Sequence, residues 1–522
     1  MYHDVRMSML IKPLVCVVYV SKITNNINFR AGKVHLFSDF DGTYLPVRHS
    51  ALYNLEPNAD LKEYVTKIDT LLKSGEDDLF FHITTGRTFG EYEEVSKLIR
   101  SRGLELPLPH SFIAKNGADE YIKSATDIEF YKGGKFPFEY YKPNLAKENL
   151  FVQTHKWDGF KIKTFIKALA DKYNINLIEG DSENSVRDYG EKSLFSKGKL
   201  NKKDWELLPR DGEKFTHYEK QLLDSTIGFR NDGNLKIHMI FPPEYGPCAE
   251  VNTLYDKFMD AIKAFLEKEK VDYKLKWEPA SKYNYYRNSC SITPNIDGEV
   301  LTKLFDTKQA LKKAIKENDM VIVAGDGSND FKMLNPLEYI EKEFWQECEK
   351  KSSNKEFYRK GMREKLEDLC LVLENKSQTP YIKSLSQELT ENGFLKKLEE
   401  LPFYSIVMKD SDSSLDILVK TFQKMKKVIV TKSGFLDEGV KSAIEFHANR
   451  KDSFKESLSQ KLREYINPKE AVSSGSSASS VNKKSPKYVV AGFLLIGLGG
   501  LYYHFSHKKQ GGQNNENLSV VA

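Results

Sequence analysis

Apolar runs and amphipathic stretches alternate along the first part of the chain. Three apolar runs predict strands at 33–40, 78–86 and 110–118, and apolar residues at helical spacing predict helices at 58–75 and 91–103. The strands lack polar–apolar alternation, which is typical of strands covered by helices on both faces. The pattern therefore predicts an α/β fold built on a Rossmann-like parallel sheet.

The same alternation returns after a long intervening region. A helix is predicted at 307–318 and a strand at 320–327, and a strand–helix–strand pattern follows at 402–444. Between these last two stretches, residues 337–401 are highly charged and helix-forming, so we expect a helical insertion there. This insertion is either a protein-partner or regulatory element or a surface hairpin without a special role.

The region between the third strand and the returning helix has its own pattern. A strand at 234–241, a helix at 250–270 and an alternating strand at 272–279 predict an inserted α+β domain. Its earlier part holds many lysines and aromatic residues, as in 131–143, which would attract a phosphorylated molecule or form a solvated loop.

The C-terminus predicts a membrane anchor. A small, polar stretch at 471–486 is typical of a flexible linker, and the 18 residues from Tyr488 to Phe505 carry no Asp, Glu, Lys or Arg. As a helix this segment would span ~27 Å, about the thickness of a bilayer core. We therefore expect a single transmembrane helix, with the N-terminal body of the protein in the cytosol. The apolar run at 14–20 predicts a strand or a leader.

Composition is that of a folded protein and excludes some classes of function. Hydrophobic residues make up 40% and charged residues 29%, and the net charge of +5 is small for 522 residues. That balance gives no reason to expect nucleic-acid binding. The cysteines are scattered without a zinc-binding or disulfide spacing, so we expect reduced thiols: Cys16, Cys248, Cys290, Cys348 and Cys370.

Two aspartates follow the first predicted strand. Asp39 and Asp41 are two positions apart in an extended segment, so both carboxylates project to one side, at the edge where parallel sheets bind ligands. Carboxylates this close repel unless a cation neutralises them or one is protonated. Gly42 allows a tight turn after them. Alone, the stretch is also compatible with an ordinary acidic turn.

Polar residues also end two other predicted strands. Thr85, Gly86 and Arg87 offer a hydroxyl, backbone N–H groups and a cation, which are the parts of a phosphate cradle. Asp326 and Asp330 flank a glycine-containing loop, and hard oxygen ligands at such a spacing suit Mg²⁺. Each stretch alone could be a polar turn; three of them at strand ends of one sheet predict a site.

Lys308 begins the helix before GDGSND, and its spacing alone does not single it out from the nearby Lys303, Lys312 and Lys313. The stretches DFDGT and TTGR, Lys308 and the stretch GDGSND resemble, in this order, the four motifs of the haloacid dehalogenase-like (HAD) hydrolases. The turn at 113–121 is similar to the point where the large-cap subgroup leaves the core for its cap, as in sucrose-phosphate phosphatase and related sugar-phosphatases. The resemblance covers the core, under half of the chain. It implies a Rossmann-like HAD core with an inserted α+β cap domain.

The resemblance implies a role for each matched residue. Asp39 is the nucleophile, Asp41 is the proton donor and base, Thr85 binds phosphoryl oxygens and Lys308 steadies the nucleophile. The implied substrate-binding residues are Gly42, Thr43, Gly86, Arg87 and Asn329. The implied Mg²⁺ ligands are Asp39, Asp41 through its backbone carbonyl, Asp326 and Asp330.

With the motifs in place, the predicted organisation covers the whole chain. It comprises a leader at 1–32, the first part of the core at 33–119, a cap at 120–289, the second part of the core at 290–336, the helical insertion at 337–401, the last part of the core at 402–446, a helix and Ser-rich linker at 447–486, the transmembrane helix at 487–506 and a polar tail at 507–522.

These features predict a membrane-tethered, Mg²⁺-dependent phosphatase. Its substrate is expected to be a small phosphorylated metabolite such as a sugar phosphate, hydrolysed through an aspartyl-phosphate intermediate. A phosphomutase is the alternative within the same chemistry. The alternative from another class is a catalytically silent, membrane-tethered scaffold, against which the chemically competent residues at all four motifs argue.

Overall fold

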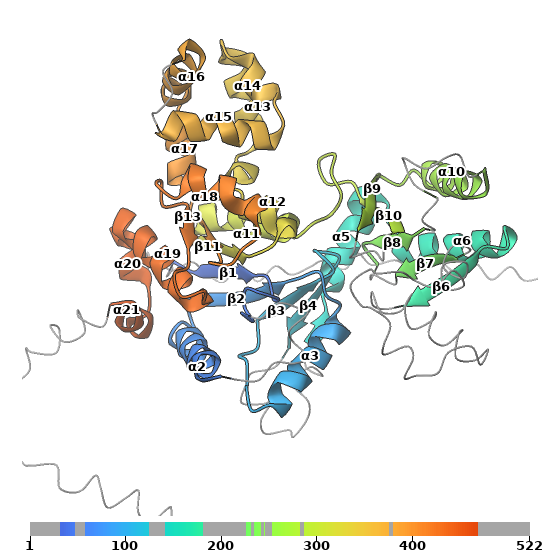
Figure 1. The fold of residues 1–522 in the computed structure, drawn as a ribbon, viewed down its shortest axis with the longest axis horizontal. Helices are drawn as coiled ribbons and strands as arrows, with labels where there is room; N and C mark the ends of the chain where they lie inside the picture. Colours follow the sequence, from blue (N-terminus) through green and yellow to red (C-terminus); the bar gives the residue numbers. More distant parts are fainter. Residues whose placement is uncertain are drawn as a thin grey trace, which may run out of the picture. The chain divides into compact units, whose positions relative to one another are not determined.

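The computed structural model describes residues 32–46, 58–124, 141–180, 226–230, 234–241, 245, 253–281, 287–374 and 379–467. All but the last of these residues belong to one compact unit, Met1–Ile466. Within the described ranges, the chain forms two β-sheets and a set of helices (Figure 1).

The first sheet has eight strands in the order β13–β12–β11–β1–β2–β3–β4–β5. Six of them run parallel, from β13 to β3, whereas β4 and β5 pair antiparallel at one edge. The mixed α/β class with a parallel core is therefore confirmed. The strands are β1 (Val34–Ser38), β2 (Leu79–Thr84), β3 (Ser111–Ala114), β4 (Asp119–Lys123), β5 (Tyr141–Pro143), β11 (Met320–Gly325), β12 (Phe403–Val407) and β13 (Val428–Val430).

Helices cover both faces of the first sheet (Figure 1). Because side chains alternate along a strand, Leu36 of β1 joins the apolar core on one face and Phe37 joins the core on the other. The first face is covered by α2 (Ala59–Ser74), α3 (Phe89–Ser101), α19 (Leu436–Arg450), α20 (Asp452–Ser457) and α21 (Gln460–Ile466). The second face is covered by α11 (Leu304–Glu317), α12 (Phe331–Leu334) and α18 (Asp416–Phe422).

Local sequence explains where the early helices begin. The Asn58 side chain accepts a hydrogen bond of 2.8 Å from the Leu61 N–H and so caps α2. At α3, Thr88 and Glu91 cap each other's backbone N–H groups in a capping box. The strands and helices expected between 33 and 118 are confirmed, with ends shifted by a few residues.

The second sheet is mostly antiparallel and has five strands in the order β6–β7–β8–β10–β9. One face packs against α6 and α10, because Ile237, Cys290 and Ile292 share a buried core with Ile166 and Phe258 of these helices. The elements of this region are α5 (Leu145–His155), α6 (Gly159–Lys172), β6 (Asn176–Gly180), β7 (Thr226–Arg230), β8 (Ile237–Ile240), α10 (Thr253–Lys268), β9 (Tyr273–Ser281) and β10 (Arg287–Pro294).

Residues 337–401 form the expected helical insertion. Its helices are α13 (Lys342–Lys351), α14 (Lys355–Arg359), α15 (Met362–Glu374), α16 (Pro380–Glu391) and α17 (Phe394–Glu400), preceded by the 3-10 helix η4 (Pro336–Tyr339). Leu366, Leu385 and Phe394 are fully buried and belong to the same apolar core as α11 and β12. The insertion is therefore continuous with the packing of the first sheet.

The limits of the predicted domains stay a prediction, and two features bear on them. Strands β4 and β5 extend the first sheet beyond residue 119, and β10 continues the second sheet beyond residue 289.

The three cysteines that the structure describes, Cys290, Cys348 and Cys370, are free thiols.

The expected membrane localisation is corrected by the structure. Within the part of the chain that is described, no helix combines the length and apolar character needed to cross a bilayer. The segment 487–506, the linker before it and the apolar run at 14–20 all lie outside the described residues. We therefore do not assign the protein to a membrane.

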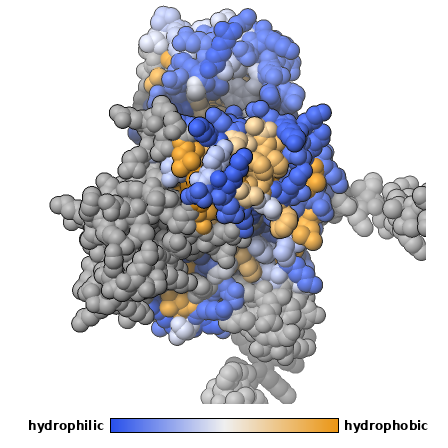
Figure 2. Space-filling view, turned by 90° about the vertical axis from the view of Figure 1, so that its right-hand side faces the viewer, coloured by the Kyte–Doolittle hydropathy of each residue, from blue (hydrophilic) through white to orange (hydrophobic). Residues whose placement is uncertain are grey.

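The surface drawn in Figure 2 is mostly hydrophilic where residues are described, with separate hydrophobic areas between the polar ones. Several large hydrophobic side chains around the second sheet are exposed to solvent: Leu145, Leu150, Val152, Phe160 and Leu254. Single exposed apolar side chains are common on folded proteins and need no partner to explain them.

Candidate active site

Three carboxylates meet at the carboxyl edge of the parallel sheet. Asp39 follows β1 and Asp326 follows β11, and these neighbouring strands are in register, so both residues arrive at one edge. The 3-10 helix η3 (Ser328–Asp330) brings Asp330 to the same place. One oxygen from each carboxylate lies within 4.8 Å of the others. Among the described residues, this is the one group of His, Cys, Asp or Glu side chains that could hold a metal ion, and its hard oxygens suit Mg²⁺.

A lysine completes this cluster. Nζ of Lys303 donates hydrogen bonds of 2.7 Å to Oδ1 of Asp39 and 2.7 Å to Oδ1 of Asp330. The Lys303 side chain is 2% exposed and Asp330 is fully buried, so both charges are satisfied by each other and not by water. We call Asp39, Asp326, Asp330 and Lys303 the acidic cluster with its lysine.

The structure corrects the placement of the predicted lysine. Lys308 does not reach the carboxylates, since its charged partner is Glu338, 4.0 Å away, and its side chain is 33% exposed. The helix α11 begins at Leu304, and its buried face is formed by Leu304, Thr307, Leu311 and Ala314. Lys308 lies at the margin of this buried face, beside Glu338. Lys303, directly before the first turn, enters the site instead.

Burial and the neighbouring charges shift the pKa values of Asp39 and Lys303. Burial raises the pKa of Asp39 to about 8; Lys303 opposes this rise and the neighbouring Asp330 adds to it. Burial by itself would lower the pKa of Lys303, but Asp330 and Asp39 together hold that pKa above its usual value. A bound divalent cation would favour the ionised form of Asp39, as a nucleophile requires.

Gly42 and Thr43 orient Asp326. The hydroxyl of Thr43 donates a hydrogen bond of 3.2 Å to Oδ1 of Asp326. Gly42 has a φ of +75°, and a Cβ at this position would lie 2.3 Å from Oδ2 of Asp326. Only glycine therefore allows the turn after Asp41 to approach the carboxylate so closely. Both residues were expected to bind substrate; in the structure they contact the acidic cluster.

Asp41 pairs with Arg87. Nε and Nη2 of Arg87 donate hydrogen bonds of 2.6 and 2.8 Å to the two oxygens of the Asp41 carboxylate. The Arg87 side chain is 9% exposed and that of Asp41 is 23% exposed. The two predicted site residues are thus brought together in a bidentate pair, which is the strongest hydrogen-bonded geometry between such groups.

The loop after β2 is held in place by backbone hydrogen bonds. Thr85 is buried, its hydroxyl accepts a hydrogen bond of 3.2 Å from the Arg87 N–H, and its own N–H donates to the Ile113 carbonyl. The Asn116 N–H donates to the Thr85 carbonyl over 2.8 Å, and a Cβ on Gly86 would lie 3.6 Å from Oδ1 of Asn116. The turn at Asn116 therefore supports the predicted phosphate loop, a role that the sequence did not reveal.

Asn329 lies in the loop between Asp326 and Asp330 and is exposed. Its side-chain oxygen would lie 2.4 Å from a Cβ placed on Gly327. Asn329 thus borders the acidic cluster, and its predicted contact with substrate stays a prediction.

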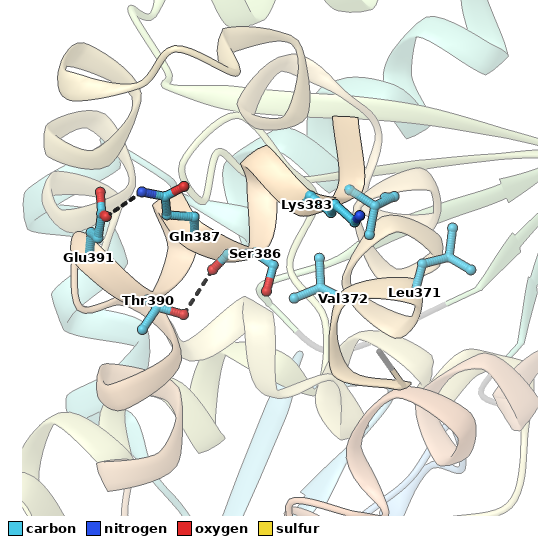
Figure 3. A pocket seen from close by; sticks show the side chains of 8 residues that line it. Leu371, Val372, Lys383, Ser386, Gln387, Thr390 and Glu391 are labelled. Carbon is cyan, nitrogen blue, oxygen red and sulfur yellow. Dashed lines mark hydrogen bonds between the residues drawn. The ribbon is translucent and has the colours of Figure 1, made fainter. Parts of the chain in front are cut away.

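A separate pocket of about 370 Å³ lies in the helical insertion (Figure 3). It is formed by α15 and α16, and its lining comprises Leu371, Val372, Ile382, Lys383, Ser386, Gln387, Thr390 and Glu391. Figure 3 shows Gln387 and Glu391 hydrogen-bonded to each other, over 2.7 Å. No residue of the acidic cluster lines this pocket, and its side chains form no catalytic arrangement.

Comparisons with known proteins add little to this geometry. No protein-family model matches the chain, and no curated protein sequence matches it. A solved structure is similar to it: the sucrose-phosphatase from Synechocystis sp. PCC6803 in complex with sucrose and phosphate. That likeness has 11% identity and a TM-score of 0.31, and covers 80% of this chain and 98% of the other. Values this low carry no argument about fold or activity, so the function has to be inferred from the site itself.

Proposed function

We propose that this protein is a Mg²⁺-dependent phosphatase that hydrolyses a small phosphomonoester through an aspartyl-phosphate intermediate. The observation that carries the proposal is the position of the Lys303 ammonium, 2.7 Å from both Asp39 and Asp330, the two buried members of a group of three carboxylates. The motif resemblance to HAD hydrolases supports it, with Lys303 taking the role expected for Lys308.

Asp39 is the proposed nucleophile. One of its oxygens attacks phosphorus, and the bond between phosphorus and the leaving oxygen breaks. Asp39, Asp326 and Asp330 would hold Mg²⁺, which when bound would neutralise negative charge on the phosphoryl oxygens. Lys303 supplies a fixed positive charge beside the attacking carboxylate and limits the repulsion between Asp39 and the incoming phosphate.

Asp41 is the proposed acid and base. It gives a proton to the leaving oxygen in the first step; in the second step it takes a proton from the water that attacks phosphorus and releases phosphate from Asp39. The bidentate pair with Arg87 holds the Asp41 carboxylate in a fixed position in the site. For the first step, we expect Arg87 to turn partly toward the phosphoryl oxygens, so that the Asp41 carboxyl group can face the leaving oxygen.

Phosphate release from a panel of phosphomonoesters, with sugar phosphates included, tests the proposal. We expect release in Mg²⁺, loss of activity in EDTA and recovery when Mg²⁺ is added back. Asp39→Asn should be inactive, and Asp60→Asn, an exposed aspartate on α2, is the matched control. Release that continues in EDTA, or in Asp39→Asn, would contradict the proposal.

A further inference from the structure

A buried lysine outside the acidic cluster connects two parts of the site. Lys147 lies on α5, and its side chain is 6% exposed. Its Nζ donates hydrogen bonds of 2.7 Å to Oδ1 of Asp306 and 2.9 Å to the backbone carbonyl of Gly117. Asp306 is 159 positions away in the sequence and Gly117 is 30 positions away, so tertiary structure alone makes this contact.

The first partner belongs to the helix that follows the site lysine. Asp306 lies in the first turn of α11, three residues after Lys303. The Oδ2 atom of Asp306 is buried and makes no hydrogen bond, whereas Oδ1 accepts the hydrogen bond from Lys147. The rings of Phe151 on α5 and Phe305 on α11 also touch, with centroids 5.2 Å apart. Lys147 therefore holds the beginning of α11 from the α5 side.

The second partner belongs to the turn that supports the phosphate loop. Lys115, Asn116 and Gly117 have φ values of +54°, +59° and +100°, which curl the chain tightly. The N–H groups of Lys115 and Asn116 donate to the carbonyls of Arg87 and Thr85, over 3.0 and 2.8 Å. These hydrogen bonds thus fix the position of the Thr85–Arg87 loop relative to this turn.

The turn and the beginning of α11 are themselves in close contact. A Cβ on Gly117 would lie 2.7 Å from the carbonyl oxygen of Thr302, the residue directly before Lys303. Lys147 hydrogen-bonds to both sides of this contact, one through a backbone carbonyl and one through a carboxylate. A small displacement of the turn at Gly117 or of the first turn of α11 would therefore move Lys147, and through Lys147 it would displace the other segment.

We propose that Lys147 is a positioning residue whose ammonium group joins the turn at Gly117 to the first turn of α11 and so fixes the Thr85–Arg87 loop relative to Lys303. A buried ion pair contributes little net stability, because the desolvation of both charges offsets their attraction. We therefore attribute the buried Lys147–Asp306 pair to the relative position that it imposes on the two segments. The expected effect on the rate of hydrolysis rests on the proposed phosphatase function. The coupling of the two segments by Lys147 does not depend on that function.

Two variants test the proposal, and a third controls it. Lys147→Met removes the charge and both hydrogen bonds but keeps the apolar stem, and Asp306→Asn removes one partner. Lys161→Met is the matched control, since Lys161 makes an ion pair of the same kind, 2.6 Å from Glu269, with 52% of its side chain exposed. Steady-state hydrolysis of p-nitrophenyl phosphate in Mg²⁺ gives kcat and KM, and amide hydrogen exchange by mass spectrometry gives the local effect.

Lys147→Met is expected to lower kcat by about 10- to 100-fold and to change KM by less than about threefold, because the reacting groups are misaligned while the substrate still binds. Asp306→Asn should lower kcat in the same direction, and Lys161→Met should leave both constants unchanged. In Lys147→Met, amide exchange should rise together in residues 113–117 and 302–306. A kcat within threefold of wild type at an unchanged fold would overturn the rate effect and leave Lys147 a merely structural residue.

The exchange measurement separates this proposal from the proposed function. If the wild-type protein hydrolyses no phosphomonoester, the proposed function fails, and exchange still decides whether Lys147 couples the two segments. Faster exchange in both segments would support the coupling. Faster exchange confined to α5, or none, would overturn it whatever the activity.

Discussion

The two sheets of this protein use polar residues in different ways. In the first sheet, parallel strands β1 and β11 end at the same edge, and the residues that follow them converge into a largely buried group of three carboxylates and a lysine. In the second sheet, strands β8, β10 and β9 are antiparallel, so their carboxyl ends point alternately to opposite edges. Its polar residues lie along the strands and not at one end.

The difference teaches why a single sheet carries the candidate site. A parallel sheet gathers residues from distant parts of the chain at one edge, whereas an antiparallel sheet separates them. In the second sheet, the buried side chains of His238 on β8 and Ser291 on the neighbouring strand β10 hydrogen-bond to each other over 2.9 Å. We therefore expect substitutions in the first sheet to change chemistry and substitutions in the second to change stability.

The largest effect is expected at Asp39. Asp39→Asn keeps the shape of the side chain but removes the nucleophile, so kcat should fall by at least about 10³-fold while the far-UV circular dichroism is unchanged. Activity near that of the wild type would contradict the proposed difference between the two sheets, because the carboxylates at the edge of the parallel sheet would then have no catalytic role.

Lys303, directly before α11, and Lys308, within α11, give a matched pair. Lys303→Met should lower kcat by roughly 10²-fold or more, since it removes the cation beside Asp39 and Asp330. Lys308→Met should stay within about twofold of wild type, since the charged partner of Lys308 is Glu338 and not Asp39 or Asp330. Steady-state kinetics in saturating Mg²⁺ measures both, and the reverse order of effects would contradict the assignment of Lys303.

Gly42 tests how tightly the edge is packed. In Gly42→Ala the added Cβ would lie 2.3 Å from Oδ2 of Asp326, in a backbone conformation that disfavours side chains. Asp326 has to move, so the apparent affinity for Mg²⁺ should fall by about 10-fold or more. Titration calorimetry measures it. Gly434→Ala is the control: its φ is +80° and its Cβ meets no atom within 4 Å, so the affinity for Mg²⁺ should not change.

A buried histidine on α19, a helix that covers the first sheet, tests whether burial of a titratable group is by itself enough to indicate a catalytic site. Burial lowers the pKa of His447 to about 3, and Lys451, Lys427 and Arg450 act in the same direction. In the unfolded chain its pKa is about 6.5, so between these values the unfolded state binds more protons and stability falls as the pH falls.

Removing this histidine should flatten the pH dependence of stability. In His447→Gln the loss of unfolding free energy between pH 7 and pH 5 should shrink by about 2 kcal/mol. Denaturant unfolding at the two pH values measures this, and hydrolysis at pH 7 should be unaffected. An unchanged slope would show that His447 stays solvated in the folded protein.

The smallest effects compare the two cores directly. Ile322 in β11 and Ile237 in β8 are both fully buried, and Ile→Val at either position should cost about 1 kcal/mol of unfolding free energy. Only Ile322→Val lies in the strand that leads into Asp326, so only this variant should lower kcat measurably. Equal kcat values would show that the strand ends are insulated from small changes in the sheet core.

Much of this site could be predicted from the order of residues along the chain. Apolar runs followed by Asp39 and Asp326 predict parallel strands with carboxylates at one edge, and Gly42 marks the tight turn after Asp41. These features are local: strand periodicity, the position after a strand and the freedom of glycine depend on a few neighbouring residues.

The lysine, the partner of Asp41 and the role of Lys147 were decided by tertiary structure alone. Several lysines lie near the beginning of α11, and which one enters the site depends on the helix face that packs against the sheet, here the face of Leu304, Leu311 and Ala314. Lys147 contacts a carboxylate 159 positions away. Such contacts depend on the relative placement of whole elements, about which the spacing of residues in one segment carries no information.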